Sequence, residues 1–444
     1  MGDHRAQRRQ GAGSGTGAGQ VPRPACRRCG LVSGRPIVET LLDTDFYKWL
    51  MLQLIRRLHP DVRTEWALIN RTRSVRLAEQ IDIGELREQL DHVRTLPLAP
   101  AERAWLGRLC FDDMCPILEP GFLDWAERLR LPAYELAVRD CQVDLRFDGP
   151  WAETTLWEIA ALAIVNELRS RAALRGVDAR SLYAGARERL RAKASRLAAI
   201  PDLMLSDFGT RRRHGRDWQE DCILTLRDAL GSRLVGTSNA LFAMRHGLEP
   251  IGTNGHELPM TLAALAPDDD ALARSPYLVL EEWDQLYGGR LLVALPDTFG
   301  TRAFLRDAPA WVADWTGFRP DSAPPVEAGE EIIAWWRRHG VDPAGKRLIF
   351  ADALDVDAIE RLHGHFAARV RTSFGWGTDL TNDTGSADPR LMPLSLVCKV
   401  TAANGRPAVK LSDNPAKALG PPAEVARYLR VFGSEGMIER SLRY

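Results

Sequence analysis

The sequence predicts an α/β protein whose centre is a barrel of parallel strands, each followed by a helix. From residue 203 onward, short apolar runs alternate with stretches of helical character, which is the pattern of successive βα units. Nearly every run ends at an aspartate, a histidine or a Gly-Thr pair. Because the loops beyond the carboxyl ends of the strands build the active site of a (β/α) barrel, polar residues gathered there indicate an enzyme of this fold.

Length, charge and cysteine content agree with such an enzyme. The chain has 444 residues, enough for a barrel and a further domain. Lysine plus arginine and aspartate plus glutamate both number 59, so no net charge draws the protein to nucleic acid, and no uncharged apolar run reaches the ~18 residues of a membrane helix. We therefore expect small-molecule partners, with no nucleic acid and no membrane among them. The seven cysteines lack a regular paired spacing, which predicts reduced thiols and a cytoplasmic protein.

Residues 1–36 differ in kind from the rest of the chain. They are rich in glycine, serine and arginine and contain no apolar stretch of a secretory signal. We interpret them as a disordered extension or as the product of a misassigned start codon. Cys26 and Cys29 have the spacing of half a zinc site, but no second ligand pair follows at a suitable distance.

The region between this extension and the barrel is predicted to be mostly helical. Residues 37–145 contain one short β-like stretch at 64–70. Gly149-Pro150 then opens a strongly apolar helix that continues to Leu168, with proline at a favoured first-turn position. A charged, arginine-rich helix is predicted over 178–198.

Seven strands are predicted after these helices. Each is a short apolar run that is bounded by turn residues. The predicted strands cover residues 203–206, 233–235, 249–251, 291–295, 317–319, 347–350 and 370–373.

Three of the predicted strand ends carry glycine and threonine. They are Gly236-Thr237, Gly252-Thr253 and Gly375-Trp-Gly377-Thr378. Such loops expose backbone N–H groups with little side-chain bulk, as a phosphate-binding loop requires. A single Gly-Thr pair is a common turn, whereas three on one barrel rim predict a phosphorylated substrate.

Charged residues at the same rim suit such a substrate. Arg211, Arg212 and Arg213 follow a strand and are candidates to clamp a diphosphate. Four aspartates follow strands and suit either Mg²⁺ or a cationic transition state, although helix capping is a competing interpretation for each. They are Asp207, Asp297, Asp321 and Asp352.

A series of short motifs runs through the chain from residue 36 to about residue 431. They are Thr44-Asp-Phe-Tyr-Lys48, Asp207-Phe-Gly-Thr-Arg-Arg-Arg213, Gly236-Thr-Ser-Asn239, Gly252-Thr-Asn-Gly-His-Glu257, Arg319-Pro-Asp-Ser322, Asp352-Ala-Leu-Asp355, Ser373-Phe-Gly-Trp-Gly-Thr378 and Lys410-Leu-Ser-Asp413. In kind and in order, this series resembles the motifs of the nicotinate phosphoribosyltransferase family.

The resemblance implies a fold and a domain organisation. Type II phosphoribosyltransferases have an irregular (β/α) barrel plus a second α+β domain that is built from N-terminal and C-terminal segments. For this chain we expect the barrel over residues 146–385, the two parts of the second domain over 37–145 and 386–431, and a tail over 432–444.

The resemblance also implies a reaction. Nicotinate and phosphoribosyl diphosphate give nicotinate mononucleotide and diphosphate, with hydrolysis of ATP, in NAD biosynthesis. Mg²⁺ accompanies ATP and phosphoribosyl diphosphate, whereas no tightly bound cofactor and no protein-held metal are expected. The family further implies a homodimer, in which Tyr47 reaches into the site of the second subunit.

Residue roles follow by the same analogy. Tyr47 and Phe208 enclose the pyridine ring, and Arg211 and Arg319 line the substrate pocket. Asp321 holds the ribose, while Gly375, Gly377 and Thr378 bind its 5′-phosphate. The remaining substrate contacts are Thr237, Ser238 and Asp352. His256 matches the histidine that ATP phosphorylates transiently, so His256, Asp321 and Arg211 are the expected catalytic residues.

The segment Arg319–Pro325 departs from the family pattern. Ala323 stands where many members have a flexible glycine, and Pro324 stands where they have a second carboxylate. The departure keeps a second hypothesis open, namely a catalytically weakened paralogue that binds nucleotides as a regulator. The retained His256, Asp321 and arginines favour the enzyme.

Ser238 predicts the choice of ring substrate. Nicotinamide-using relatives have an aspartate after the Gly-Thr pair, where it accepts from the amide. The neutral Ser238 does not repel a carboxylate, so we expect nicotinate to be preferred over nicotinamide.

Overall fold

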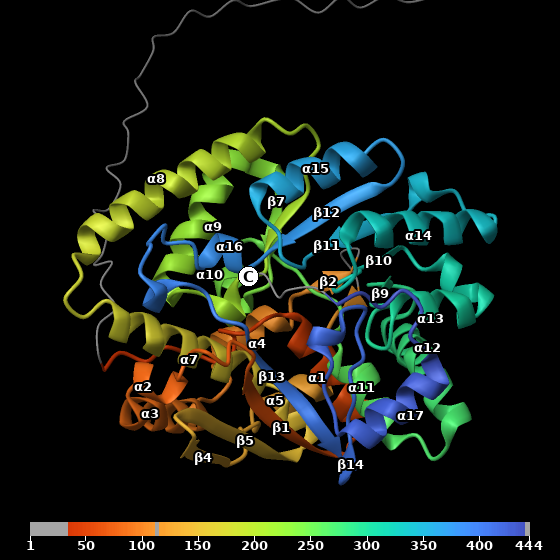
Figure 1. Ribbon diagram of the computed structural model, residues 1–444, viewed down its shortest axis with the longest axis horizontal. Helices are drawn as coiled ribbons and strands as arrows, with labels where there is room; N and C mark the ends of the chain where they lie inside the picture. The colour runs from red at the N-terminus through yellow and green to blue at the C-terminus, as the bar shows by residue number, and fades with distance from the viewer. Residues whose placement is uncertain (1–33, 112–114, 440–444) are drawn as a thin grey trace, which may run out of the picture.

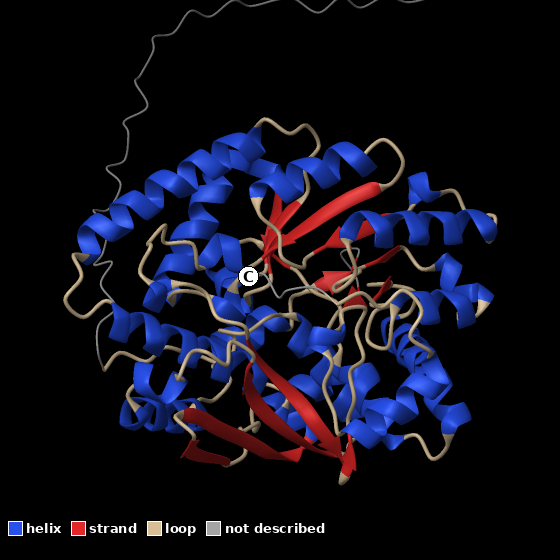
Figure 2. Ribbon diagram, viewed as in Figure 1, coloured by secondary structure: helices blue, strands red, loops and turns tan. Residues whose placement is uncertain are grey.

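A computed structural model describes residues 34–111 and 115–439 of the chain (Figure 1). The interpretations of residues 1–33, including the Cys26–Cys29 pair, and of residues 440–444 lie outside this description. Within it, a parallel sheet and an antiparallel sheet occupy separate parts of the molecule (Figure 2). No helix in the described ranges combines the length and the apolar character needed to cross a bilayer.

All seven predicted strands form, and together they make one parallel sheet. Their order is β8-β7-β6-β12-β11-β10-β9, and every neighbouring pair is parallel. This is the chain order around a ring that is open between β8 and β9, so the predicted irregular barrel is confirmed. The strands are β6 (Leu205–Asp207), β7 (Leu234–Thr237), β8 (Glu249–Pro250), β9 (Val293–Ala294), β10 (Gly317–Phe318), β11 (Arg347–Phe350) and β12 (Arg371–Trp376).

Helices alternate with these strands, and Figure 1 shows α8, α9, α14 and α15 around the parallel sheet. Local sequence sets where they begin: Asn239 and Asp355 accept backbone N–H groups in the first turns of α10 and α15, and Pro325 opens α14. The helices are α6 (Trp151–Thr154), α7 (Trp157–Ala173), α8 (Ala179–Ala198), α9 (Arg216–Leu230), α10 (Ala240–His246), α11 (Glu257–Leu265), α12 (Asp269–Tyr287), α13 (Thr301–Asp307), α14 (Pro325–Arg338), α15 (Val356–Phe366) and α16 (Thr378–Thr381).

The antiparallel sheet joins the two ends of the chain, at the lower edge of Figure 1. Its order is β14-β13-β1-β5-β4, so the C-terminal strand β13 lies directly against the N-terminal strand β1. The expected second domain of N-terminal and C-terminal segments is thus confirmed. The strands are β1 (Arg63–Asn70), β4 (Tyr134–Arg139), β5 (Gln142–Pro150), β13 (Leu396–Ala403) and β14 (Arg406–Pro407).

The mostly helical prediction for residues 37–145 missed the hairpin of β4 and β5. Val143, Leu145 and Phe147 are buried on β5 and alternate with more exposed residues, which is the period of a half-buried strand. The prediction gave more weight to Gly149-Pro150 as a helix start, although the helix begins just after it, at Trp151. The remaining elements here are α1 (Tyr47–Leu58), α2 (Leu77–Gln80), α3 (Ile83–Thr95), α4 (Pro100–Leu106), β2 (Cys110–Phe111), β3 (Cys115–Pro116) and α5 (Pro120–Ala126).

The last helix, α17 (Pro422–Phe432), packs against the barrel part of the molecule. Phe432 stacks on Phe299 with ring centroids 4.5 Å apart, and Tyr428 meets Phe299 edge-on at 5.4 Å. The C-terminal segment therefore contacts both parts of the molecule, and on its way between them it passes the carboxyl ends of the barrel strands.

A buried ion pair attaches the start of the described chain to the barrel. The Arg213 guanidinium donates to both carboxylate oxygens of Asp43, at 2.7 and 2.8 Å, and Asn239 donates to the same carboxylate at 2.8 Å. Arg213 and Asp43 are both buried. The expectation that Arg213 clamps a diphosphate is therefore wrong, because its guanidinium is enclosed and paired. Its role is to place the first residues of α1 beside the strand ends.

We predict that Asp43→Ala lowers the free energy of unfolding by about 3–5 kcal/mol, because the substitution leaves the Arg213 cation buried without a counter-ion. Urea denaturation measures the effect. Asp148→Ala is the matched control, since Asp148 pairs with Arg63 at 2.9 Å on the exposed surface and its loss should leave the midpoint almost unchanged. Equal shifts in the two variants would contradict the prediction.

Candidate functional site

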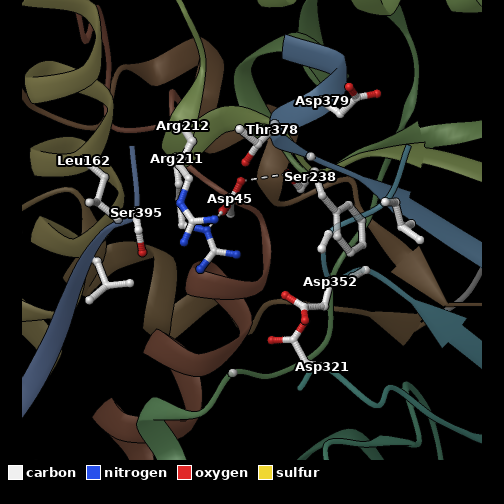
Figure 3. Close-up of a pocket in the computed structure, with 18 of the residues that line it drawn as sticks. Asp45, Leu162, Arg211, Arg212, Ser238, Asp321, Asp352, Thr378, Asp379 and Ser395 are labelled. Atoms are coloured by element: carbon white, nitrogen blue, oxygen red, sulfur yellow. Dashed lines mark hydrogen bonds and ion pairs between the residues drawn. The ribbon is translucent and has the colours of Figure 1, made fainter. Parts of the chain in front are cut away.

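A cleft of about 1030 Å³ lies at the carboxyl ends of the barrel strands. Loops after β6, β7, β8, β10, β11 and β12 line it, together with α1, α7 and the C-terminal segment. Most of the predicted site residues come together here, and Figure 3 shows Arg211 and Arg212 extending into the space. The predicted residues that line the cleft are Tyr47, Phe208, Arg211, Ser238, His256, Arg319, Asp321, Asp352, Gly377 and Thr378.

Thr237 does not line the cleft but supports the turn that carries Phe208. Its hydroxyl donates to Asp207 at 2.7 Å, and Asp207 also accepts from Gln219 at 2.8 Å and from the backbone N–H of Gly209 at 2.9 Å. Asp207 is fully buried, and burial raises its pKa to about 6. The suggestion that Asp207 binds Mg²⁺ is therefore wrong, because protein donors occupy its carboxylate.

Gly375 also stays outside the cleft, directly behind the Phe208 ring. A β-carbon at this position would lie 2.3 Å from Cδ2 of Phe208, far inside van der Waals contact. Glycine is needed here so that the aromatic ring can lie flat against β12. The residue thus shapes the cleft wall instead of facing the space itself.

One end of the cleft, which we call the ring end, is formed by Asp45, Tyr47, Phe208, Arg211 and Ser238. Tyr47 belongs to the same chain as the others, and its hydroxyl lies 3.5 Å from the Glu158 carboxylate. A β-carbon at Gly252 would lie 2.8 Å from Cβ of Tyr47, so the loop after β8 packs closely on the start of α1. No second subunit is needed to bring Tyr47 into the cleft, contrary to the expectation.

Arg211 lies between two carboxylates without a close contact to either. Its Nε is 3.5 Å from Asp45 and its Nη1 is 3.6 Å from Glu158, distances longer than a hydrogen bond. Its side chain is 39% exposed and lines the cleft. The guanidinium donors are therefore available to a carboxylate or phosphate in the cleft.

Ser238 is paired with a carboxylate that the sequence reasoning did not select. Its hydroxyl donates to Asp45 at 2.7 Å (Figure 3), and the Phe46 N–H donates to the Ser238 carbonyl at 2.6 Å. Asp45 is buried, and burial raises its pKa. Asp45 belongs to the Thr44–Lys48 motif, and this membership was the one feature of the sequence that could have identified it as a site residue. Because the Ser238 hydroxyl already donates to Asp45, Arg211 is the charged donor that the ring end offers to a ligand.

Another part of the cleft, which we call the histidine end, contains His256 and three charged neighbours. Nδ1 of His256 lies 2.9 Å from the Thr298 hydroxyl, and Nε2 lies 3.3 Å from Asp321 and 3.8 Å from Asp297. Burial, with a smaller contribution from Lys410, lowers the pKa of His256 to about 4. The imidazole is therefore neutral near pH 7, so one ring nitrogen carries a proton and the other a lone pair.

Lysines from the C-terminal segment complete this end, and the sequence reasoning assigned them no role. Lys417 donates to Asp352 at 2.8 Å and to the Asp321 carbonyl at 3.2 Å. Lys410 is buried beside the cleft, and burial lowers its pKa to about 8. Lys410 belongs to a recognised motif, but the sequence does not show that it lies near His256, because the two residues are far apart along the chain. Two cations thus face the carboxylates of Asp321 and Asp352.

None of the four candidate aspartates caps a helix. Asp297 is fully buried and accepts from Ser322 at 2.6 Å, so it lies behind the cleft. Asp321 and Asp352 line the cleft and point toward each other in Figure 3. Although burial opposes it, His256, Lys417 and Arg319 hold the pKa of Asp321 below its usual range. Among residues 34–111 and 115–439, no group of three or more histidine, cysteine or acidic side chains is arranged to hold a metal.

Comparison with known proteins decides the family. Residues 203–435 match the model of the nicotinate phosphoribosyltransferase (NAPRTase) family, and residues 42–166 match the model of its N-terminal domain. The chain belongs to the nicotinate phosphoribosyltransferase family. A nicotinate phosphoribosyltransferase structure from Vibrio cholerae is 34% identical with a TM-score of 0.81, over 91% of this chain and 96% of that one. One from Porphyromonas gingivalis is 28% identical with a TM-score of 0.80, over 89% and 100%.

The structure shows how residues 319–325, which depart from the family pattern, are held in place. Arg319 donates to the Asn254 carbonyl at 2.7 Å, and Ser322 is fixed by Asp297, so Asp321 is held on both sides. Pro324 and Pro325 then start α14, where a fixed backbone angle favours the first turn. Ala323 and Pro324 do not line the cleft. The altered residues therefore leave the position of Asp321 intact.

We predict that His256 stays neutral down to about pH 5 in the folded enzyme. Nitrogen-15 NMR of labelled histidine measures its titration. The unfolded chain has the ordinary histidine pKa of about 6.5, so it binds a proton first as the pH falls. Stability is therefore full above pH 6.5 and declines between pH 6.5 and 4. His256→Asn should make this decline shallower, and a His256 pKa at or above 6.5 would contradict the assignment.

Proposed function

We propose that this enzyme transfers the phosphoribosyl group of phosphoribosyl diphosphate to the ring nitrogen of nicotinate, giving nicotinate mononucleotide and diphosphate for NAD biosynthesis. One observation carries the proposal: an aromatic and arginine-bearing ring end and a histidine end with carboxylates and lysines share a single cleft in a chain of this family. Formation of labelled mononucleotide from labelled nicotinate tests it. Nucleotide binding without any product would instead support the regulatory paralogue.

The ring end suits an aromatic acid. The Phe208 and Tyr47 side chains offer apolar faces for a pyridine ring, and the Arg211 guanidinium offers two parallel N–H donors to its carboxylate. The pyridine nitrogen has a free lone pair and ends as a quaternary centre. No proton has to be removed, so the reaction needs no general base.

The catalytic task is to stabilise separating charges. The ribose carbon becomes oxocarbenium-like while the C–O bond to diphosphate breaks and the C–N bond forms. The ionised Asp321 suits the cationic ribose, and Lys410 and Lys417 suit the departing diphosphate. Backbone N–H groups around Gly377 and Thr378 are the proposed contacts of the 5′-phosphate, as the family resemblance implies.

Mg²⁺ is proposed to enter with the diphosphate substrate. Magnesium commonly keeps several waters and takes one or two carboxylates in addition to phosphate oxygens. Asp321 and Asp352, which line the cleft and point toward each other, could supply these one or two carboxylates. The ion would neutralise diphosphate charge, whereas the residues of the chain position the ribose and the ring.

ATP hydrolysis is proposed to pass through His256. Nε2 of the neutral imidazole would attack the γ-phosphorus, so that an N–P bond forms, the bond to the bridging oxygen breaks, and ADP leaves. This attack requires the tautomer in which Nδ1–H donates to the Thr298 hydroxyl, and the observed 2.9 Å separation permits it. Water would later cleave the N–P bond and regenerate the imidazole.

A cytoplasmic location and a homodimer are proposed from composition and family resemblance. Light scattering measures the oligomeric state. Because Tyr47 lies in the cleft of its own chain, we expect each subunit to carry a complete ring end even if the enzyme is dimeric.

We predict that nicotinate is preferred over nicotinamide by at least about 100-fold in kcat/KM, because the amide cannot form the ionic contact with Arg211. Ser238→Asp should lower kcat/KM for nicotinate by a similar factor, since it places a second carboxylate next to Asp45. Ser238→Ala is the control and should cost much less. Competition kinetics with both pyridines measures these values, and comparable turnover of both by the unmodified enzyme would contradict the prediction.

We predict that His256→Ala abolishes ATP hydrolysis but leaves a slow, ATP-independent synthesis. The ribosyl chemistry uses Asp321 and the cations, which the substitution leaves in place. Simultaneous measurement of ADP and nicotinate mononucleotide separates the two activities. If the variant still hydrolyses ATP in step with product formation, His256 is structural and the phosphohistidine proposal fails.

A further inference from the structure

Glu158, on α7, joins three separate parts of the chain at one buried carboxylate. Its oxygens lie 2.7 Å from Nζ of Lys48 on α1 and 2.7 Å from Nζ of Lys399 on β13. The same carboxylate lies 3.5 Å from the Tyr47 hydroxyl and 3.6 Å from the Arg211 guanidinium. Its side chain is only 3% exposed. The two residues it approaches at longer distance are those that face a ligand at the ring end.

The neighbours of Glu158 keep its carboxylate ionised. Burial opposes ionisation, but Lys399, Lys48 and Arg211 together hold the pKa of Glu158 well below its usual range. Lys48 is itself fully buried and donates to Glu257 at 2.5 Å and to Thr155 at 3.1 Å. The carboxylate is therefore ionised and held in one orientation by two ammonium groups.

We infer that Glu158 is a positioning residue for the ring substrate. It sets the orientation of Arg211 and Tyr47, whereas the substrate contacts those two side chains. The inference deepens the proposed function and rests on it for the identity of the ring substrate. It also explains why the cleft includes β13, because Lys399 from this strand contacts one oxygen of the carboxylate while Lys48 from α1 contacts the other.

Replacing Glu158 by glutamine would remove the charge and keep the shape of the side chain. Arg211 would then no longer lie between two close carboxylates, because only Asp45 and, with a weaker effect, Asp321 would remain as its anionic neighbours. Lys399 and Lys48 would lose a counter-ion. Burial already lowers the pKa of Lys399 while Glu158 opposes that effect, so the substitution lowers this pKa further.

The kinetic test compares Glu158→Gln with Glu167→Gln. Glu167 lies on the same helix, is equally buried, and pairs with Arg171 at 2.9 Å away from the cleft. We expect Glu158→Gln to raise KM for nicotinate by about 10-fold while kcat and KM for phosphoribosyl diphosphate change by less than about 2-fold. Glu167→Gln should change none of the three.

The pH dependence of kcat/KM for nicotinate is a second test, because it would not change if Glu158 had only a structural role. The groups that face Glu158 are Lys48, Lys399, Arg211 and Tyr47, and of these Lys399 has its pKa lowered by burial. The alkaline limb of kcat/KM for nicotinate should therefore shift to lower pH in Glu158→Gln. An unchanged limb together with an unchanged KM for nicotinate would overturn the inference.

A substrate-independent measurement separates the inference from the proposed function. Although burial opposes it, Glu158 helps to raise the pKa of Arg211, so its loss favours the neutral guanidine that phenylglyoxal attacks. Arg211 should therefore react faster with phenylglyoxal in Glu158→Gln than in the unmodified protein or in Glu167→Gln, as mass spectrometry of its peptide reports. Equal reaction rates would overturn the inference even if nicotinate is the substrate. Faster reaction without any turnover of nicotinate would support it and refute the proposed function instead.

A second variant keeps the inference testable if the first variant fails to fold. If Glu158→Gln does not fold, Glu158→Gln combined with Lys399→Met removes one anion and one cation together and restores the charge balance. The double variant still lacks the carboxylate beside Arg211, so faster phenylglyoxal modification is again expected. A rate equal to that of the unmodified protein would overturn the inference.

Discussion

The cleft depends above all on the attachment of residues 43–48 to the rim of the barrel. Asp43 is clamped by Arg213 and Asn239, Asp45 accepts from Ser238, and Lys48 donates to Glu257 at the head of α11. These contacts are buried, so the loss of one partner would leave an uncompensated charge inside the protein. Because Tyr47 lies between them, its ring is placed by the same contacts.

Several charged groups around the cleft are paired with each other, whereas Arg211 stays available to a ligand. Glu158 lies between Lys48 and Lys399, and Lys417 lies against Asp352. Arg211, by contrast, stands more than 3.4 Å from both carboxylates that flank it. A binding site for anions needs such a group, since a guanidinium already hydrogen-bonded to protein has fewer donors left for a ligand.

The barrel was predictable because its signals are local. Each of its strands is a short apolar run followed by turn residues, and these signals are legible in a single sequence. The hairpin of β4 and β5 was less accessible, since the alternation of Val143, Leu145 and Phe147 competed with the helix signal of Gly149-Pro150. The pairing of β1 with β13 came from family resemblance, because nothing local relates strands more than 300 residues apart.

The sequence by itself determined the barrel, the family and most of the residues that line the cleft, because short motifs at strand ends carry this information. Tertiary structure alone decided which charged side chains are free and which are enclosed. Arg211 and Arg213 are two positions apart, yet one faces the cleft and the other is buried against Asp43. Lys399 and Glu158 likewise meet only through folding. The physical reason is that burial and pairing depend on segments that are distant along the chain.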